Sequence, residues 1–386
     1  MKQIRLEDKE KERYLVRKGD LLICEGGDVG RAAIWESENP IYYQNALHRV
    51  RFYQNINQYF FIHLLNYYKN LGLIDDVSGG VTIKHFTQNS MQKLLFPLAP
   101  LNEQEKIVEE IDRIFSLIDS LDKDKEELQT AIKQTKSKIL DLAIHGKLVA
   151  QDPSDEPASV LLKKLREEKE AKIKAGELKR DKNDSYIYKN ATDNCHCEKF
   201  TNGTVHEIDV PFEIPESWSW SRLGSICDYG KCKNASTDEL SEDSWILDLE
   251  DIEKDTGKIL KIVHFKDRKS LSTKHVFNKG DLLYSKLRPY LNKVVIAPKD
   301  GFCTSEILPL DFNGVLSNEY GQHLFMSSYF LETVNFLTYG VKMPRLGTDD
   351  ARKILIPLPP LAEQKRIVEK IENAFAKLDF IAEQLA

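Results

Sequence analysis

The sequence predicts a mixed α/β fold with two globular blocks in tandem, each followed by a long helix, and the two helices packed as an antiparallel coiled coil. Three observations predict it. The chain repeats itself at a shift of about 260 residues, β-rich runs mix with helical runs inside each copy, and an apolar heptad follows each copy.

The repeat is clearest in two short segments. PLAPLNEQEKIVEEI at 97–111 returns as PLPPLAEQKRIVEKI at 357–371 with ten identical positions, and KGDLL at 18–22 returns at 279–283. Both pairs keep nearly one offset, so whole domains are duplicated rather than a short solenoid unit. The prolines end the preceding strand because proline lacks a ladder donor. We expect a helix to begin near Asn102 and near Ala362, with glutamate in its first turn.

Apolar residues recur along both helices at alternating spacings of four and three, the 3.5-residue period of a coiled-coil seam. We expect the helices to pair through Ile107, Ile111, Ile114, Ile118, Leu121, Ile367, Ile371, Leu378 and Ile381. The first helix, about 40 residues long, would measure about 60 Å. The alternative is that each helix packs only on its own domain. The apolar residues fall at the same heptad positions in both copies, which favours two helices packed on each other.

Pattern and composition divide the chain into five parts. They are a partial first globular domain at 1–96, a long helix at 97–150, a charged linker at 151–204, a second globular domain at 205–356 and a shorter second helix at 357–386. DLLICEGG, RAAIWE, DLLYSKL and KVVIAP predict strands, and residues 57–71 and 318–337 predict helices. Gly146 should close the first helix, and the charge-rich segment 161–184 predicts a solvated helix leading into a flexible linker.

The composition excludes several classes of protein. Hydrophobic residues at 41% and aromatic residues at 9% are globular values, which excludes wholesale disorder. No apolar run reaches the ~18 residues of a membrane span, and the charged amino terminus does not match a signal peptide. Six scattered cysteines indicate reduced thiols in a cytoplasmic protein. A net charge of −6 argues against a protein that coats nucleic acid non-specifically. Local basic surfaces are still compatible with this net charge.

The chain resembles the specificity subunit of type I restriction–modification systems over nearly its whole length. The resemblance is carried by the two PLxPLxEQ helix starts, the connector IHGKLVAQDPSDEPASVLLKKLREEKE, and the segments FEIPESWSWSRLGSI and VKMPRLGTDDARKILIPLPPL. It implies two target-recognition domains that each read half of a split double-stranded DNA sequence and are held apart by paired helices. It also implies modification subunits that methylate adenine, and a restriction subunit that translocates and cuts DNA.

The first domain departs from the family pattern. The second domain begins near Pro211, 68 residues before its KGDLL, whereas 17 residues precede the KGDLL of the first. The second helix stops at Ala386, which corresponds to Glu126 in the first. In a cyclic two-repeat design these differences form one continuous gap. We therefore expect a shortened first domain, and a homodimer as one further assembly.

The strongest candidate for DNA contact is SKLRPYLNK at 285–293, where cations alternate with polar and aromatic residues after a predicted strand. Its candidates are Lys286, Arg288, Tyr290, Asn292 and Lys293. Arginine and lysine donate to guanine or phosphate, and asparagine pairs with adenine. VKMPRLG at 341–347 adds Lys342 and Arg345 on a Gly/Pro loop. The alternative for both is a solvated loop.

In the first domain, YYQNALHRVR at 42–51 and VTIKHF at 81–86 present the corresponding candidates. They are Gln44, Asn45, His48, Arg49, Lys84 and His85. A purely structural role is favoured more strongly here than in the second domain, because the first domain is shortened.

The sequence carries no recognisable catalytic site. Asn39-Pro40-Ile41-Tyr42 lacks the second proline of a methyltransferase loop, and EGGDVG lacks the spacing of a nucleotide-binding loop. Cys195-His196-Cys197 has no second pair at zinc-finger spacing. We expect no catalytic residue, metal or cofactor on this chain; the resemblance places S-adenosylmethionine, ATP and Mg on partner subunits. The rival hypotheses are a coiled-coil assembly subunit without DNA readout and an enzyme with an unrecognised site.

Overall fold

The computed structural model describes residues 7–44, 46–53, 55–80, 84–181, 184–190, 194–268, 272–340 and 342–385. The chain forms two units, Met1–Glu126 and Glu127–Ala386, called here the first and second unit. The boundary between them falls inside helix α5 (Leu101–Ile144), which begins within one residue of the position predicted from the sequence. Each unit is described by itself.

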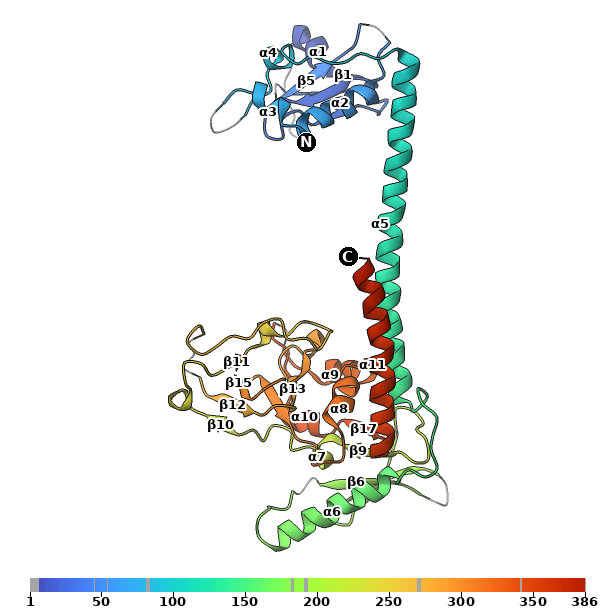
Figure 1. Ribbon diagram of the computed structural model, residues 1–386, viewed down its shortest axis with the longest axis vertical. Helices are drawn as coiled ribbons and strands as arrows, with labels where there is room; N and C mark the ends of the chain where they lie inside the picture. The colour runs from blue at the N-terminus through green and yellow to red at the C-terminus, as the bar shows by residue number, and fades with distance from the viewer. Residues whose placement is uncertain are drawn as a thin grey trace. The chain divides into compact units, whose positions relative to one another are not determined.

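The first unit is a small antiparallel sheet covered by helices (Figure 1). Strand β2 (Leu21–Cys24) lies between β3 (Ala32–Ile34) and β5 (Leu47–Val50), and β1 (Leu15–Val16) pairs with β4 (Ile41–Tyr42). The helices are α1 (Asp8–Tyr14), α2 (Gln58–Asn70), α3 (Leu73–Val77) and α4 (Gln88–Met91). Its core joins the inward side chains of β2 to the helices, through Leu21, Ile23, Leu65, Ile74 and Phe86.

The second unit contains the same arrangement in a larger setting. Strand β13 (Leu282–Ser285) lies between β14 (Val294–Ile296) and β16 (Ile307–Leu310), as β2 lies between β3 and β5. A second sheet holds β10 (Asn234–Ala235), β12 (Lys274–Phe277), β15 (Gly301–Thr304) and β11 (Ile246–Leu247). Strand β9 (Ser219–Arg222) pairs antiparallel with β17 (Leu355–Leu358). The duplication predicted from the sequence therefore extends to strand order.

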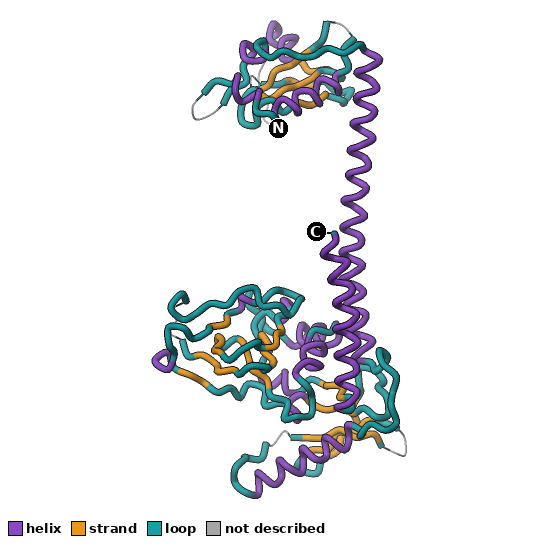
Figure 2. The backbone as a smooth tube through the Cα atoms, in the orientation of Figure 1, coloured by secondary structure: helices purple, strands orange, loops and turns teal. Residues whose placement is uncertain are grey.

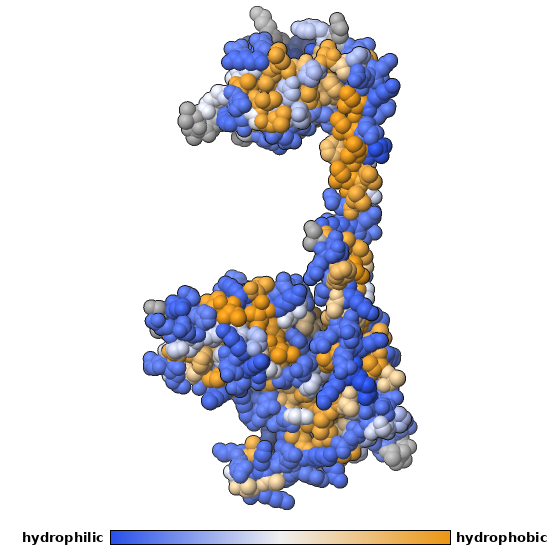
Figure 3. All heavy atoms as spheres, viewed as in Figure 1, coloured by the Kyte–Doolittle hydropathy of each residue, from blue (hydrophilic) through white to orange (hydrophobic). Residues whose placement is uncertain are grey.

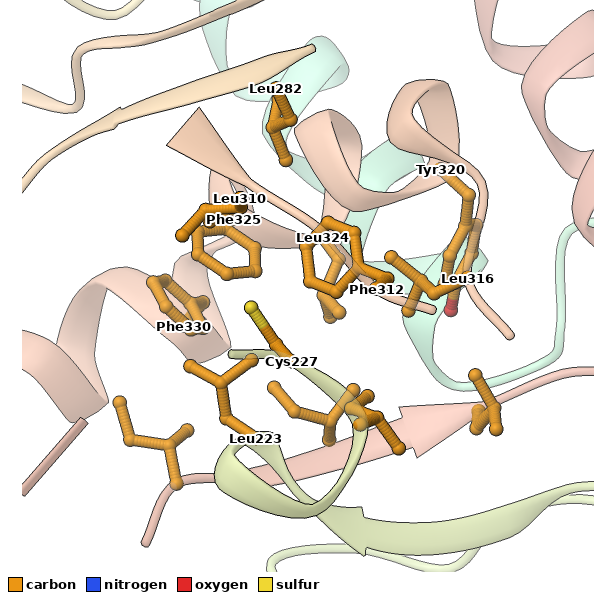
Figure 4. Packing of buried hydrophobic residues seen from close by; sticks show 14 of the residues in the cluster. Leu223, Cys227, Leu282, Leu310, Phe312, Leu316, Tyr320, Leu324, Phe325 and Phe330 are labelled. Atoms are coloured by element: carbon orange, nitrogen blue, oxygen red, sulfur yellow. The ribbon is translucent and has the colours of Figure 1, made fainter. Parts of the chain in front are cut away.

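Short helices complete the second unit, whose buried apolar residues form one large cluster and a smaller one at the second sheet. The short helices are α7 (Leu223–Ile226), α8 (Asn318–Phe325), α9 (Ser328–Leu337), α10 (Thr348–Arg352) and the 3-10 turns η1 (Thr237–Glu239), η2 (Leu249–Asp251) and η3 (Pro289–Leu291). Figure 4 shows Phe325 and Phe330 beside Cys227 and Leu223 in the larger cluster, and Tyr320 beside Leu316. The larger cluster joins residues of α5, α6 and α11 to the strands and short helices of the second domain.

The helix predicted over 318–337 is two helices. The chain breaks at Met326–Ser327, and Ser327 caps α9 by accepting a hydrogen bond from the Phe330 amide at 3.3 Å. The same hydroxyl donates to the Leu324 carbonyl at 2.7 Å. Local serine bonds of this kind compete with the helical ladder, which explains the break.

The segment 151–204, which we expected to be a charged linker, is folded in its described parts. Helix α6 (Ala158–Lys174) buries Ala158 and Leu165, and β6 (Ser185–Lys189), β7 (His196–Phe200) and β8 (Val205–Ile208) form an antiparallel sheet (Figure 2). Glu198 of β7 is buried and accepts from Arg222 at 2.7 Å and from the Ser185 hydroxyl at 2.5 Å. Charge density misled the prediction because these charges are paired rather than solvated.

Helix α11 (Leu361–Gln384) packs antiparallel along the part of α5 that belongs to the second unit (Figure 1). Ile367 and Ile371 are fully buried in a cluster with Leu140, Ala143 and Ile144 of α5. Further along the pair, the Lys136 ammonium donates to Asp379 at 2.5 Å and lies 5.0 Å from the Phe375 ring centroid. The predicted antiparallel helix pair is confirmed.

The predicted seam is only partly covered. Leu378 is half-buried, but Ile381 is 42% exposed. In the first unit, Ile107 and Ile111 are half-buried, whereas Ile114, Ile118 and Leu121 are 44%, 45% and 59% exposed. Apolar side chains line this part of α5 in Figure 3. The described residues therefore bring Ile367 and Ile371 into the helix pair but leave Ile114, Ile118 and Leu121 without a covering partner.

The glutamine of each PLxPLxEQ segment ties a long helix to the domain before it. Gln104 accepts a hydrogen bond from the Asn57 amide at 2.9 Å and donates to the Ala99 carbonyl at 2.7 Å. Gln364 repeats both bonds, accepting from the Ser317 amide at 2.8 Å and donating to the Pro359 carbonyl at 3.0 Å. Asn57 and Ser317 are the N-caps of α2 and α8. The same pair of glutamine hydrogen bonds therefore connects the start of the long helix to the start of the equivalent short helix in each unit.

Candidate nucleic-acid interface

The two loops that the sequence singled out in the second domain lie against each other. The Arg288 amide donates to the Pro344 carbonyl at 2.7 Å, and the Leu346 amide donates to the Lys286 carbonyl at 2.9 Å. Leu287 and Arg345 form an isolated antiparallel bridge. Residues 285–293 and 342–347 therefore form one surface, called here the paired loops, where β13 ends.

The backbone of the paired loops adopts an uncommon conformation. Arg288 and Asn292 both have positive φ, at 50° and 49°, on either side of η3. Non-glycine residues rarely adopt this left-handed region, and such residues concentrate at functional sites. Pro289 follows Arg288 and begins η3, and the Ser285 hydroxyl donates to the Leu287 carbonyl at 2.8 Å. The loop is therefore held in one shape by its own bonds rather than by the exposed side chains.

Three cations of the paired loops are available to a ligand. Arg288 and Lys342 are exposed, Lys286 is half-buried, and none of the three forms a side-chain hydrogen bond or ion pair with another described residue. An unpaired guanidinium offers five donors in a planar fork, which suits a guanine edge or a phosphate. The arrangement concentrates free positive charge on a chain whose net charge is −6.

Arg345 differs from these cations because it is already paired. Its guanidinium donates to the Glu306 carboxylate at 3.2 and 2.9 Å, and this hydrogen bonding raises the pKa of Arg345. The pair is partly exposed, so water screens it and its contribution to stability is small. A DNA contact by Arg345 would have to share or displace Glu306.

Two of the predicted contact residues, buried Asn292 and half-buried Lys293, bond to other parts of the second unit. Asn292 is buried, its amide nitrogen donates to the Met326 carbonyl at 3.4 Å, and its side-chain oxygen has no partner among the described residues. The Lys293 ammonium donates to the Leu249 carbonyl at 2.6 Å, and burial lowers the pKa of this lysine. The side chains of Asn292 and Lys293 are thus held by carbonyls outside the paired loops, while Tyr290 is 45% exposed.

Large exposed apolar side chains occur within and just before the second of the paired loops, and they were not among the residues predicted from the sequence. Tyr339 bonds with Arg345 through both backbone groups, and Tyr339, Met343 and the nearby Phe336 are all exposed. Exposed aromatic rings can stack on bases or pack against sugars. Met343 lies within the predicted loop, and Tyr339 lies two residues before it. The signal that could have found them is the run of aromatic residues at the end of a predicted helix.

The candidates in the first unit are mostly bonded within that unit. Arg49 donates to the Leu15 and Glu12 carbonyls, and Lys84 lies 3.1 Å from Asp75. His48 Nε2 lies 2.7 Å from the Phe86 carbonyl oxygen. His85 forms backbone bridges with Gly26 and Gly79 at the positions that Arg345 occupies in the second unit. Gln44 is exposed, and Asn45 lies outside the described residues.

Neither a metal-binding cluster nor a membrane helix occurs in the described part of the chain. No three histidine, cysteine, aspartate or glutamate residues gather there in a way that could hold a metal ion. None of the described helices is long and apolar enough to cross a bilayer. All six cysteines are free thiols, and burial raises the pKa of Cys227 and Cys303 well above the ordinary value.

Comparison with known proteins identifies one family. The family model described as the type I restriction modification DNA specificity domain matches residues 2–130 and 215–386. The EcoDI specificity subunit of Escherichia coli is 25% identical over 316 residues, covering 82% of this chain and 63% of the relative. The EcoAI specificity subunit of Escherichia coli is 28% identical over 297 residues, covering 74% of this chain and 46% of the relative. The chain therefore spans about half to two thirds of the length of these relatives.

Solved structures share the fold. The HsdS subunit from Thermoanaerobacter tengcongensis aligns with a TM-score of 0.53 at 15% identity and covers 96% of this chain and 77% of that chain. A chain from a structure that describes assembly and conformational transition of the type I R-M system gives a TM-score of 0.56 at 16% identity, with the same coverage. These likenesses concern the arrangement of elements, which agrees with the duplicated units described above.

Proposed function

Because this chain belongs to the type I restriction modification DNA specificity family, we propose that it selects the DNA sequence on which a type I restriction–modification complex acts. In this proposal the chain is a binding subunit and catalyses no step itself. Its target is double-stranded DNA with two recognised parts, one for each target-recognition domain.

The observation that carries the proposal is the surface formed by the paired loops. Lys286, Arg288 and Lys342 have no ion-pair partner among the described residues, although their loops are fixed by backbone bonds. Unpaired cations on a loop of fixed shape suit the binding of nucleic acid. Binding then breaks no existing ion pair, and little backbone entropy is lost because the loop is already ordered. Exposed Tyr339 and Met343 add apolar contact area beside them. Base edges, rather than phosphates alone, are the ligand that such a mixed surface fits.

The catalytic activities belong, in this proposal, to partner subunits. We propose modification subunits that methylate adenine with S-adenosylmethionine, and a restriction subunit that uses ATP and Mg to translocate and cut DNA. The long helices are the natural contact for such partners, since Ile114, Ile118 and Leu121 present an apolar face on α5.

The proposal is tested by selecting bound duplexes from a random pool. The chain, assembled with modification subunits of the same system, should enrich one sequence with two fixed blocks separated by an unspecified spacer. Arg288→Ala should alter or relax one block only, because the paired loops belong to one domain. Lys163→Ala is the matched control, since Lys163 is 71% exposed on α6, within the same unit. Enrichment of no sequence, with the complex intact, would refute the proposal.

A coiled-coil assembly subunit without DNA readout is the second candidate, favoured by the uncovered face of α5. The two functions make different predictions in the selection experiment. An assembly subunit would form the complex but enrich no sequence, and Arg288→Ala would change nothing. The fixed geometry of the paired loops supports the DNA-reading role over this one.

A further inference from the structure

Equivalent segments at the end of the two domains differ sharply in how they are covered. Leu355–Leu358 forms strand β17 in the second unit, and residues 95–98 occupy the same place in the repeat of the first unit. Strand β9 pairs along the whole of β17, with Trp220 opposite Pro357 and Ser219 opposite Leu358. As a result Pro357 and Leu358 are fully covered.

No described strand pairs with residues 95–98 of the first unit. Leu98 is 67% exposed where its counterpart Leu358 is fully buried, and Leu95 is 87% exposed. A segment with exposed leucines whose backbone pairs with no described strand is a surface that accepts an added strand. The contrast therefore marks an open strand position in the first unit.

The glutamate of the PLxPLxEQ segment shows the same contrast. In the second unit, Glu363 is fully buried and accepts from the Trp218 indole N–H at 2.9 Å and from the Gln151 amide at 2.5 Å. Trp218 stands immediately before β9, so this bond fixes the end of the strand that covers β17. Its counterpart Glu103 is exposed and has no side-chain partner among the described residues.

The rest of the open position is built as in the second unit. The Tyr68 hydroxyl donates to the Leu95 carbonyl at 2.5 Å, as the Tyr329 hydroxyl donates to the Leu355 carbonyl at 2.8 Å. Tyr68 also stacks on Phe96, with ring centroids 5.3 Å apart. The first unit thus holds residues 95–98 in place without the strand that covers their counterparts.

We propose that residues 95–103 of the first unit are a docking site for an extended tryptophan-bearing segment of a partner polypeptide, of the type that residues 212–226 form in the second unit. The segment would add a strand along residues 95–98, cover Leu95 and Leu98, and donate an indole N–H to Glu103. Backbone bonds supply affinity in such strand addition, and side-chain pockets supply specificity. This site is independent of DNA recognition by the paired loops.

The test uses a fluorescein-labelled peptide with the sequence of residues 212–226 and the full-length chain, with binding followed by fluorescence anisotropy. The peptide should bind saturably, and Glu103→Ala should weaken it about tenfold or more, because a hydrogen bond to a charged acceptor is lost. A peptide carrying Trp218→Phe should lose a similar factor. Combining both changes should cost little more than either alone, since they remove the two ends of one bond.

Controls separate this site from others on the chain. Glu105→Ala, another exposed glutamate on the same helix, should leave peptide affinity unchanged. Leu98→Asp should weaken binding as strongly as Glu103→Ala, and both residues are exposed, so neither change should impair folding. Absence of saturable binding overturns the proposal. Binding that is insensitive to Glu103→Ala also overturns it, because the peptide would then occupy another place, such as that of β9 in the second unit.

Discussion

Replacing Ile371 by alanine should destabilise the second unit strongly, whereas the same replacement at Ile381 should not. Ile371 is fully buried among residues of α5 and α11, and Ile381 on the same helix is 42% exposed. Ile371→Ala removes three carbons, worth about 2.4 kcal/mol at ~0.8 kcal/mol each, and leaves a cavity that brings the cost to about 3–4 kcal/mol. Ile381→Ala should change stability by about 0.5 kcal/mol or less, because alanine also favours the helix.

Thermal unfolding followed by circular dichroism measures both effects. A unit of this size should lose about 6–16 °C with Ile371→Ala and about 2 °C or less with Ile381→Ala. Urea unfolding provides a second reading, in which the midpoint should fall while the slope stays constant. Equal losses for the two variants would refute the helix pairing, because they would mean that burial along α11 does not follow the described contacts.

Three further predictions follow from single contacts. Burial lowers the pKa of His323 to about 4, so the unfolded chain binds more protons between pH 4 and 6.5 and stability should fall as pH drops through that window. His323→Gln should reduce the slope of unfolding free energy against pH by up to about 1.4 kcal/mol per pH unit. Gln104→Ala should cost the first unit about 1–3 kcal/mol in denaturant titration, because the Asn57 amide loses its acceptor, and Gln104→Glu should cost at least as much, because a buried carboxylate would face the Ala99 carbonyl. Arg49→Ala should lower stability of the first unit by about 1–2 kcal/mol through lost bonds to the Leu15 and Glu12 carbonyls, with no change in DNA discrimination by duplex titration.

The duplicated fold could be predicted because its signals are local and occur twice. The KGDLL and PLxPLxEQ segments mark a strand and a helix start, and the structure places β2, β13, α5 and α11 there. The heptad predicted the helix pair because the 3.5-residue spacing of apolar residues is enough to indicate that one helix packs along another. The stretch of α5 that is covered depends on how far α11 runs alongside it. The spacing of apolar residues does not indicate that length.

The folded segment after α5 could not be predicted, because charge density does not reveal pairing. Glu198 lies on β7 and Arg222 ends β9, 24 residues later in the sequence, and the packing of β9 against the β6–β7 sheet brings them together. Composition therefore indicated a linker where tertiary contacts build a small sheet.

The candidate site could be predicted as two loops but not as one surface. Residue types singled out 285–293 and 341–347, and the structure joins them through backbone bonds between residues more than 50 positions apart. Sequence could not separate exposed Arg288 from Arg345, which Glu306 pairs, or from buried Asn292. That distinction arises from the fold of the loops rather than from their composition.

The central proposal, that the paired loops read DNA sequence, is tested most directly by titrating Arg288→Ala and Lys163→Ala against the selected duplex and a scrambled one at several salt concentrations. If Arg288 contacts a base edge, its loss should remove about 1–3 kcal/mol of discrimination between the duplexes, whereas Lys163→Ala should remove none. If Arg288 contacts only phosphate, affinity for both duplexes should fall equally and the salt slope should shrink by about one. An Arg288→Ala chain that keeps both the discrimination and the salt slope of the unmodified chain would contradict the proposal.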